Sequence, residues 1–147
     1  MIEDRDSWET PTEFWRMLNS QYHFDFDCCA NAKNTKTLDY SEDFLKEDEI
    51  PRTAWMNPPF SKANEMFNHF FKVVKEGVAI YRCDNMETKV WQEQILPFAS
   101  WIWIPRGRIA YEGQEGNGAR FPSAIIGFNV SKPVFSGGHI LNKLGED

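Results

Sequence analysis

Apolar residues along the chain recur with either a helical or a strand period. Spacings of three and four residues predict three helices, over residues 10–20, 62–75 and 87–98. Alternating or continuous apolar runs predict strands over residues 24–28, 37–44, 53–56, 78–81, 101–104 and 123–130, the second of them a short strand and turn. The Gly-rich stretch 106–118 predicts a hairpin or loop.

Prolines and glycines mark where several of these elements begin and end. Thr10 before Pro11 predicts a helix start, with Thr10 as the N-cap and Pro11 at the first helical position. Pro58 and Pro59 stop the strand that precedes them, because proline cannot donate to a sheet ladder. Gly77 predicts the end of the second helix.

Strands that alternate with helices predict an α/β fold in which helices flank a mostly parallel sheet. No linker rich in Gly, Ser or Pro divides the chain, so we expect residues 1–147 to form a single compact domain. Ligands of such sheets bind at the carboxyl ends of strands, near a change in strand order. Asp27, Asn57 and Asp84 each follow a predicted strand, so we expect them at one edge of the sheet.

Charge and hydropathy narrow the classes of function that fit this chain. Its net charge of −6 and pI of about 5.1 count against a long-range electrostatic attraction to DNA, although local basic patches still permit binding. No run approaches the roughly 18 apolar residues that span a bilayer, and the acidic N-terminus lacks an apolar signal core. We therefore expect a cytoplasmic protein with no membrane partner. Basic residues with few acids among them stand in the last third: Arg106, Arg108, Arg120, Lys132 and Lys143.

The cysteines, histidines and tryptophans of the chain favour structural roles. Cys28, Cys29 and Cys83 contain no C-x-x-C pair, so we expect small buried side chains and no metal site. The three histidines are expected to be structural or to lie at the surface. Most of the six tryptophans are expected in the core, and Trp8 is the best candidate among them for a ligand contact.

The strongest chemical signal is the tetrapeptide Asn57-Pro58-Pro59-Phe60. The exocyclic amine of a base is a poor nucleophile because its lone pair is delocalised into the ring. Asn57 Oδ1 and the Pro58 carbonyl oxygen can accept its two N–H groups and localise that lone pair. The prolines stiffen the loop, and Phe60 offers an aromatic face to a base turned out of its helix. Methyl transfer then depends on positioning and needs no strong general base.

An N-P-P-[YF] tetrapeptide resembles the catalytic motif of amino-methyltransferases that act on DNA adenine. The ordered set of segments around it is similar to the compact phage-type DNA N-6-adenine-methyltransferase (Dam) family, over roughly residues 6–128. The segments that carry the likeness are Trp8-Glu9-Thr10-Pro11, Phe24-Asp25-Phe26-Asp27 with Ala30 and Asn34, Asn57-Pro58-Pro59-Phe60-Ser61, Asp84 to Trp91, and Pro105-Arg106-Gly107-Arg108-Ile109.

This resemblance implies a Rossmann-like S-adenosylmethionine-dependent methyltransferase fold that methylates the N6 amino group of adenine in DNA. It implies that Asn57, Pro58, Pro59 and Phe60 are catalytic, and that the residues binding the methyl donor are Trp8, Thr10, Pro11, Asp27 and Asn34. Asp43 and Phe44 fall about where the family has a second acidic stretch on the donor side.

Residues on the DNA side are predicted from their charge and their place after strands. Arg106 and Arg108 follow Pro105 and can contact phosphates or guanine edges, although a solvated hairpin explains them equally well. Asp84 and Lys89, with Thr88, are expected near the target strand or base. The expected partner is double-stranded DNA, bound by a monomer or a weak homodimer.

The chain also departs from larger methyltransferases in ways that leave alternatives open. Cys28-Cys29-Ala30 replaces the F-x-G-x-G donor loop, Phe60 replaces the more usual Tyr, and no segment is long enough for a separate target-recognition domain. The catalytic loop alone fits a methyltransferase for RNA adenine or protein glutamine as well. The missing glycines fit a non-catalytic module that binds the donor or DNA.

Overall fold

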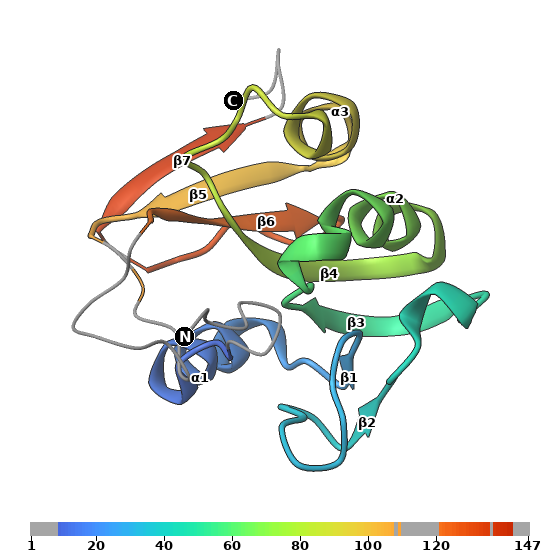
Figure 1. The fold of residues 1–147 in the computed structure, drawn as a ribbon. Helices are drawn as coiled ribbons and strands as arrows, with labels where there is room; N and C mark the ends of the chain where they lie inside the picture. Colours follow the sequence, from blue (N-terminus) through green and yellow to red (C-terminus); the bar gives the residue numbers. More distant parts are fainter. Residues whose placement is uncertain (1–8, 108, 110–120, 136, 143–147) are drawn as a thin grey trace, which may run out of the picture.

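The computed structural model describes residues 9–107, 109, 121–135 and 137–142, and these form one layered α/β unit (Figure 1). Its strands join in one sheet with the order β2-β1-β3-β4-β6-β5-β7. The strands are β1 (Phe26–Asp27), β2 (Asp39–Tyr40), β3 (Ile50–Met56), β4 (Val74–Arg82), β5 (Trp101–Pro105), β6 (Ser123–Phe128) and β7 (Gly138–Asn142). The helices are α1 (Thr12–Tyr22), α2 (Ala63–Val73) and α3 (Leu96–Phe98), with 3-10 turns η2 (Phe44–Lys46) and η3 (Phe60–Lys62) and a π-helix, η4 (Val90–Ile95).

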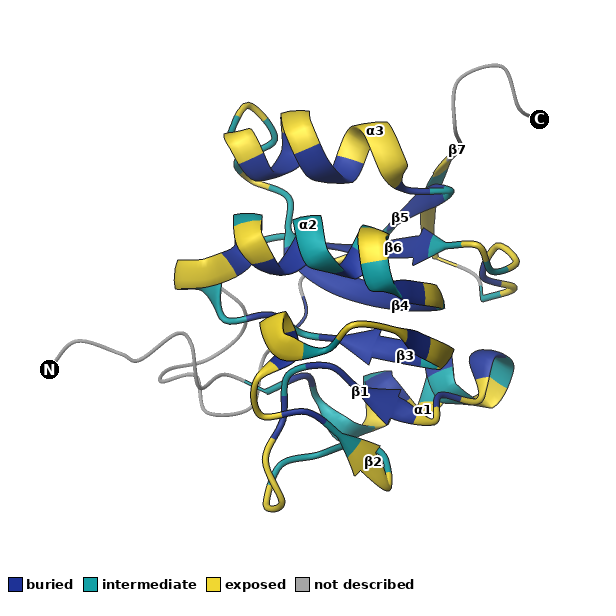
Figure 2. Cartoon of the chain, turned by 90° about the vertical axis from the view of Figure 1, so that its right-hand side faces the viewer, coloured by how far each residue is buried: buried dark blue, intermediate teal, exposed yellow. Residues whose placement is uncertain are grey.

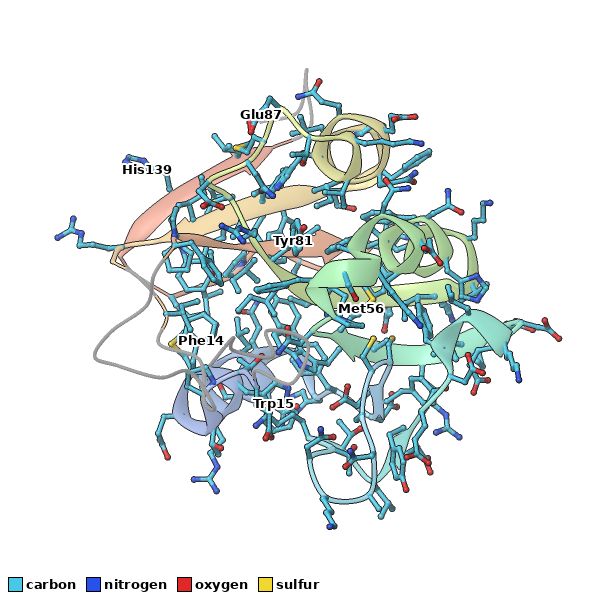
Figure 3. All side chains as sticks on the ribbon, viewed as in Figure 1. Phe14, Trp15, Met56, Tyr81, Glu87 and His139 are labelled. Atoms are coloured by element: carbon cyan, nitrogen blue, oxygen red, sulfur yellow. The ribbon has the colours of Figure 1, made fainter. Side chains whose placement is uncertain are left out.

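Helices cover both faces of the sheet, so the central strands are buried on both sides (Figure 2). Ala54, Met56 and Tyr81 face one cluster, which also holds the inner faces of α2 and η4. Trp55 and Ile80 face the opposite cluster, to which α1 contributes. Figure 3 shows the labelled Met56 and Tyr81 in the interior, and Glu87 and His139 at the periphery. The continuous apolar runs predicted as buried strands arise from this double burial.

The sheet is mixed, and the expectation of a mostly parallel sheet is therefore wrong for its second half. The pairs β1–β2, β1–β3 and β3–β4 are parallel, whereas β4–β6, β5–β6 and β5–β7 are antiparallel and contain most of the paired residues. Strand β6 lies between β4 and β5 and runs against both. An apolar run specifies a buried strand but carries no information on its direction, which explains the error.

Several predicted boundaries also change in the structure. Thr10 does not cap the first helix: Pro11 is its N-cap residue, no side chain caps it, and it continues to Tyr22. Gly77 does not end a helix, because α2 stops at Val73 and Gly77 lies inside β4. A Cβ at Gly77 would stand 2.7 Å from the Ala54 carbonyl oxygen, so glycine permits the close approach to β3.

Two further differences concern the C-terminal part of the chain. The helix expected over 87–98 begins as the π-helix η4, a form that is frequent near functional sites. Strand β7 was not predicted, because its run Gly-His-Ile-Leu-Asn is short and shows no clear alternation. Residues 108 and 110–118 of the predicted hairpin lie outside the described residues. The five described tryptophans are all buried, as expected: Trp15, Trp55, Trp91, Trp101 and Trp103. None of the helices described here has the length and hydropathy to span a bilayer.

Candidate active site

A pocket of about 400 Å³ opens at the carboxyl ends of β1 and β3. The chain leaves β1, pairs β2 on one side of it, and then returns to pair β3 on the other side. This change of direction leaves a crevice between the loops that follow β1 and β3, where ligands of α/β sheets bind. The residues that line it are Glu9, Thr10, Asp27, Cys28, Cys29, Ala30, Asn31, Asn34, Lys36, Glu42, Phe44, Trp55, Asn57, Pro59, Lys62 and Met66.

Asp27 is the last residue of β1 and lies in the wall of this pocket with 3% of its surface exposed. Its Oδ2 accepts the Lys36 N–H at 3.0 Å, and its Oδ1 accepts the Cys29 N–H at 3.3 Å. Burial raises the pKa of the Asp27 carboxyl from 3.8 to about 6, although these two hydrogen bonds favour the charged form. Asp27 therefore fixes the loop after β1 and titrates close to neutral pH.

The loop after β1 is braced by asparagine side chains instead of glycines. Asn34 Oδ1 accepts the Asn31 N–H at 2.7 Å, and Asn31 Oδ1 accepts the backbone N–H groups of Lys33 and Asn34. These contacts are local side-chain-to-backbone turns of the kind that Asn favours. The loop is thus held in shape beside the pocket, and Asn34, predicted for the donor site, lines it.

Thr10 is the most unusual polar residue of the pocket wall. It is 1% exposed, and its Oγ1 has no hydrogen-bond partner among the described residues. A buried hydroxyl without a partner costs about 1–3 kcal/mol. Because Thr10 lines the pocket, a bound ligand can satisfy this hydroxyl. Pro11, its predicted companion, does not line the pocket in the described structure, and Trp8 lies outside the described residues.

The loop Asn57-Pro58-Pro59-Phe60 begins directly after β3 and joins the pocket to a neighbouring aromatic cluster. Asn57 and Pro59 line the pocket, while Pro58 is buried. Phe60 is half-buried and does not line the pocket; it begins η3 and lies edge-on to Tyr81 and to Phe121, with ring centroids 5.9 and 5.4 Å away. The loop therefore separates a polar pocket containing Asp27 from an aromatic side containing Phe60.

Arg82, which was not singled out from the sequence as a site residue, ends β4 next to this aromatic side. Its Nε and Nη2 donate to the two carboxylate oxygens of Asp84, both at 2.7 Å. Its guanidinium carbon lies 4.6 Å from the Phe121 ring centroid and 5.9 Å from that of Phe60. Asp84, predicted to act on the DNA side, is therefore held by an arginine. The local sequence Arg82-Cys83-Asp84 does not predict that the arginine pairs with the aspartate or packs against aromatic rings.

The remaining residues predicted for DNA lie away from the pocket. Arg106 is exposed directly after β5, and Lys89 is exposed just before η4. Strands β1, β3, β4 and β5 share one direction, so Arg106 stands at the same edge of the sheet as Asp27 and Asn57. Arg108 lies outside the described residues.

Sequence reasoning also missed several charged residues of the pocket wall. Lys36, Glu42 and Lys62 join Glu9 and Asp27 there, so the wall carries both signs of charge. Of the acidic stretch expected on the donor side, Phe44 lines the pocket, whereas Asp43 forms an exposed ion pair with Lys46. Burial raises the pKa of the Cys29 thiol, which keeps it protonated in the wall. Of these charged residues, only Lys62 lies close in the sequence to a motif that predicts the site, five residues after Asn57.

Comparisons with known proteins identify a family and a relative that this chain matches. A sequence model of the family described as DNA N-6-adenine-methyltransferase (Dam) matches residues 1–126. The chain is also similar to the DNA N-6-adenine-methyltransferase of Haemophilus phage HP1 (strain HP1c1), with 35% identity over 63 residues. That segment covers 40% of this chain and 36% of the phage protein, so the match spans little more than a third of the relative's length.

Proposed function

Because the chain belongs to the DNA N-6-adenine-methyltransferase (Dam) family, we propose that it transfers a methyl group from S-adenosylmethionine to the N6 amino group of adenine in DNA. The observation that carries the proposal is a single pocket, at the change of strand order, that Asp27 and Asn57 both line. Strands β2, β1, β3 and β4 form a parallel half-sheet around it, which supports a Rossmann-like donor-binding fold.

The pocket fits a methyl donor in size and chemistry. Its volume of about 400 Å³ falls in the usual range for small-molecule sites. The donor carries a sulfonium and an ammonium group, and an ionised Asp27 supplies the opposite charge. Thr10 Oγ1 offers a buried hydroxyl that has no partner among the described residues. We assign the donor side to Thr10, Asp27 and Asn34, while Trp8 and Pro11 remain predictions from the resemblance.

The loop Asn57–Phe60 supports the target side of the reaction. Asn57 Oδ1 and the Pro58 carbonyl oxygen would accept the two N–H groups of the adenine amine and localise its lone pair. The bound donor supplies a methyl carbon activated by its sulfonium. Thr10, Asp27 and Asn34 would hold the donor, whose sulfonium would leave as a neutral thioether, and the methylated amine would release one proton to water. Two fixed acceptors and a stiff loop thus provide positioning, which dominates the rate gain.

Phe60 supports base extrusion, because an adenine must leave the duplex stack to reach Asn57. The Phe60 ring is half-buried and is held by Tyr81 and Phe121. A fixed aromatic ring next to the two acceptors offers a stacking surface for the extruded base. Phosphates flanking it would meet Arg106 and Lys89, both exposed, and Arg108.

The test is the variant Asn57→Ala, assayed by transfer of a labelled methyl group to duplex DNA. We expect a loss of about 100-fold or more in kcat, as for the removal of one fixed transition-state contact. The matched control is Glu93→Ala, which removes an exposed side chain of η4 that does not line the pocket and should retain the full rate. Wild-type rate in Asn57→Ala would refute the mechanism. Parallel assays with RNA and a glutamine peptide separate the alternative substrates.

A further inference from the structure

The carboxyl end of β4 carries a side-chain assembly that the proposed chemistry does not yet use. It consists of Arg82, Asp84, Phe60 and Phe121, which we call the arginine–aromatic cluster. Arg82 makes two parallel hydrogen bonds to Asp84, the geometry in which arginine pairs most strongly with a carboxylate. The same guanidinium lies within 6 Å of the centroids of both rings, the distance range of cation–π contacts.

The backbone beneath Arg82 is also fixed. Arg82 pairs with Ser123 of β6, and its carbonyl oxygen accepts the indole N–H of Trp91 at 3.0 Å. The following residue, Cys83, donates its N–H to the Pro122 carbonyl oxygen at 2.9 Å. Trp91 is fully buried in η4, so the π-helix anchors the end of β4. The backbone of Arg82 is thus held by the sheet, and its guanidinium is held by Asp84.

This arrangement argues against a direct phosphate contact by Arg82. The carboxylate of Asp84 compensates the charge of the guanidinium and occupies two of its donor groups. A phosphate would also meet the negative charge of Asp84. By contrast, a guanidinium fixed over two rings restricts where those rings can move. One of them, Phe60, belongs to the loop that carries Asn57.

We propose that Arg82, held by Asp84, is a positioning residue that fixes the Phe60 ring for stacking on the extruded adenine. This role rests on the proposed function and adds to it a residue that holds the stacking ring in place. Phe121 is the second ring under the guanidinium and is packed edge-on to Phe60. Phe60 thus contacts Phe121, Tyr81 and the Arg82 guanidinium, and Asp84 holds that guanidinium by two hydrogen bonds.

The test compares Arg82→Met, Arg82→Lys and Asp84→Asn with the wild type in steady-state methyl transfer to duplex DNA. Methionine keeps most of the packing and loses the charge, so we expect kcat to fall about tenfold, the effect of a lost, partly desolvated cation–π contact. Lysine keeps the charge without the planar fork and should recover part of the rate. Asp84→Asn should lower kcat by a smaller factor.

A spectroscopic measurement separates positioning from mere stability. The duplex carries 2-aminopurine in place of the target adenine, at a site identified by sequencing DNA that the wild type has methylated. Because stacking on an aromatic ring quenches 2-aminopurine, we expect Arg82→Met to change the fluorescence of the extruded base from the wild-type value, with Arg82→Lys intermediate. The Kd for S-adenosylmethionine should stay within about twofold, because neither Arg82 nor Asp84 lines the donor pocket. The control is Arg52→Met, which breaks a surface ion pair with Asp39 at the β2–β3 side of the sheet.

The outcomes distinguish this proposal from the one it rests on. If the wild type methylates DNA while Arg82→Met keeps its kcat and its 2-aminopurine signal, the positioning role is wrong and the proposed function stands. A loss of rate that follows a lower Tm, with an unchanged fluorescence signal, would also overturn the positioning role. A wild type that transfers no methyl group to DNA would refute the proposed function itself, and the role of Arg82 with it.

Discussion

Because the pKa of Asp27 is raised, we predict that the free energy of unfolding depends on pH in a specific way. Burial raises this pKa from 3.8 to about 6 in the folded protein. Well below pH 4 the carboxyl is protonated in both the folded and the unfolded states, so it contributes no penalty. Between pH 4 and 6 the Asp27 carboxyl is ionised in the unfolded chain but still mostly protonated in the folded protein, so the free energy of unfolding falls as the pH rises. Above pH 6 both states are ionised, and the penalty is constant at about 3 kcal/mol.

The variant Asp27→Asn removes this titration. Its amide turns an N–H group toward either the Cys29 or the Lys36 N–H, which costs about 1–3 kcal/mol at every pH. The absolute stabilities of the two proteins are therefore less informative than their pH dependence. Because more than half of the unfolded chains are already ionised at this carboxyl at pH 4, we expect the wild type to lose about 2 kcal/mol relative to the variant between pH 4 and 7. Because Asp27 is only 3% exposed, solvent screening reduces this figure little.

Urea denaturation at several pH values between 4 and 8 measures this difference directly. Asp25→Asn, which removes an exposed carboxylate two residues earlier, is the matched control. Calorimetry adds an independent arm: the affinity of the wild type for S-adenosylmethionine should rise about tenfold from pH 5 to pH 7, because a cationic ligand favours ionised Asp27. Parallel pH profiles for wild type and Asp27→Asn would refute the reasoning about burial.

Two further predictions concern buried positions. Thr10→Val replaces a hydroxyl that has no partner among the described residues by a methyl group, so thermal unfolding should show equal or about 1 kcal/mol higher stability, while calorimetry shows weaker binding of S-adenosylmethionine. A clear loss of stability would mean that the hydroxyl is satisfied within the protein. Gly127→Ala places a Cβ in steric conflict with the buried Trp101 ring and should cost about 1–3 kcal/mol in urea denaturation. An unchanged midpoint would show that this ring moves freely.

Local patterns in the sequence determined where the strands that border the pocket end. The apolar run before Asn57 and the two prolines after it predicted a strand that ends at the Asn57–Phe60 loop, and β3 ends at Met56. The alternation before Asp27 likewise predicted a strand end, and Asp27 closes β1. Both signals are local, because burial of successive side chains and the missing N–H of proline act within a few residues.

Only the tertiary structure decided how these strand ends meet and what surrounds them. The antiparallel insertion of β6 between β4 and β5 depends on hydrogen bonds between distant residues, and the same apolar run serves either direction. The partners of Arg82 and the raised pKa of Asp27 arise from side chains and burial contributed by other elements. The sequence therefore determined which groups stand at the ends of strands. Long-range packing decided their neighbours, their exposure and thus their chemistry, because those energies depend on contacts that no local pattern records.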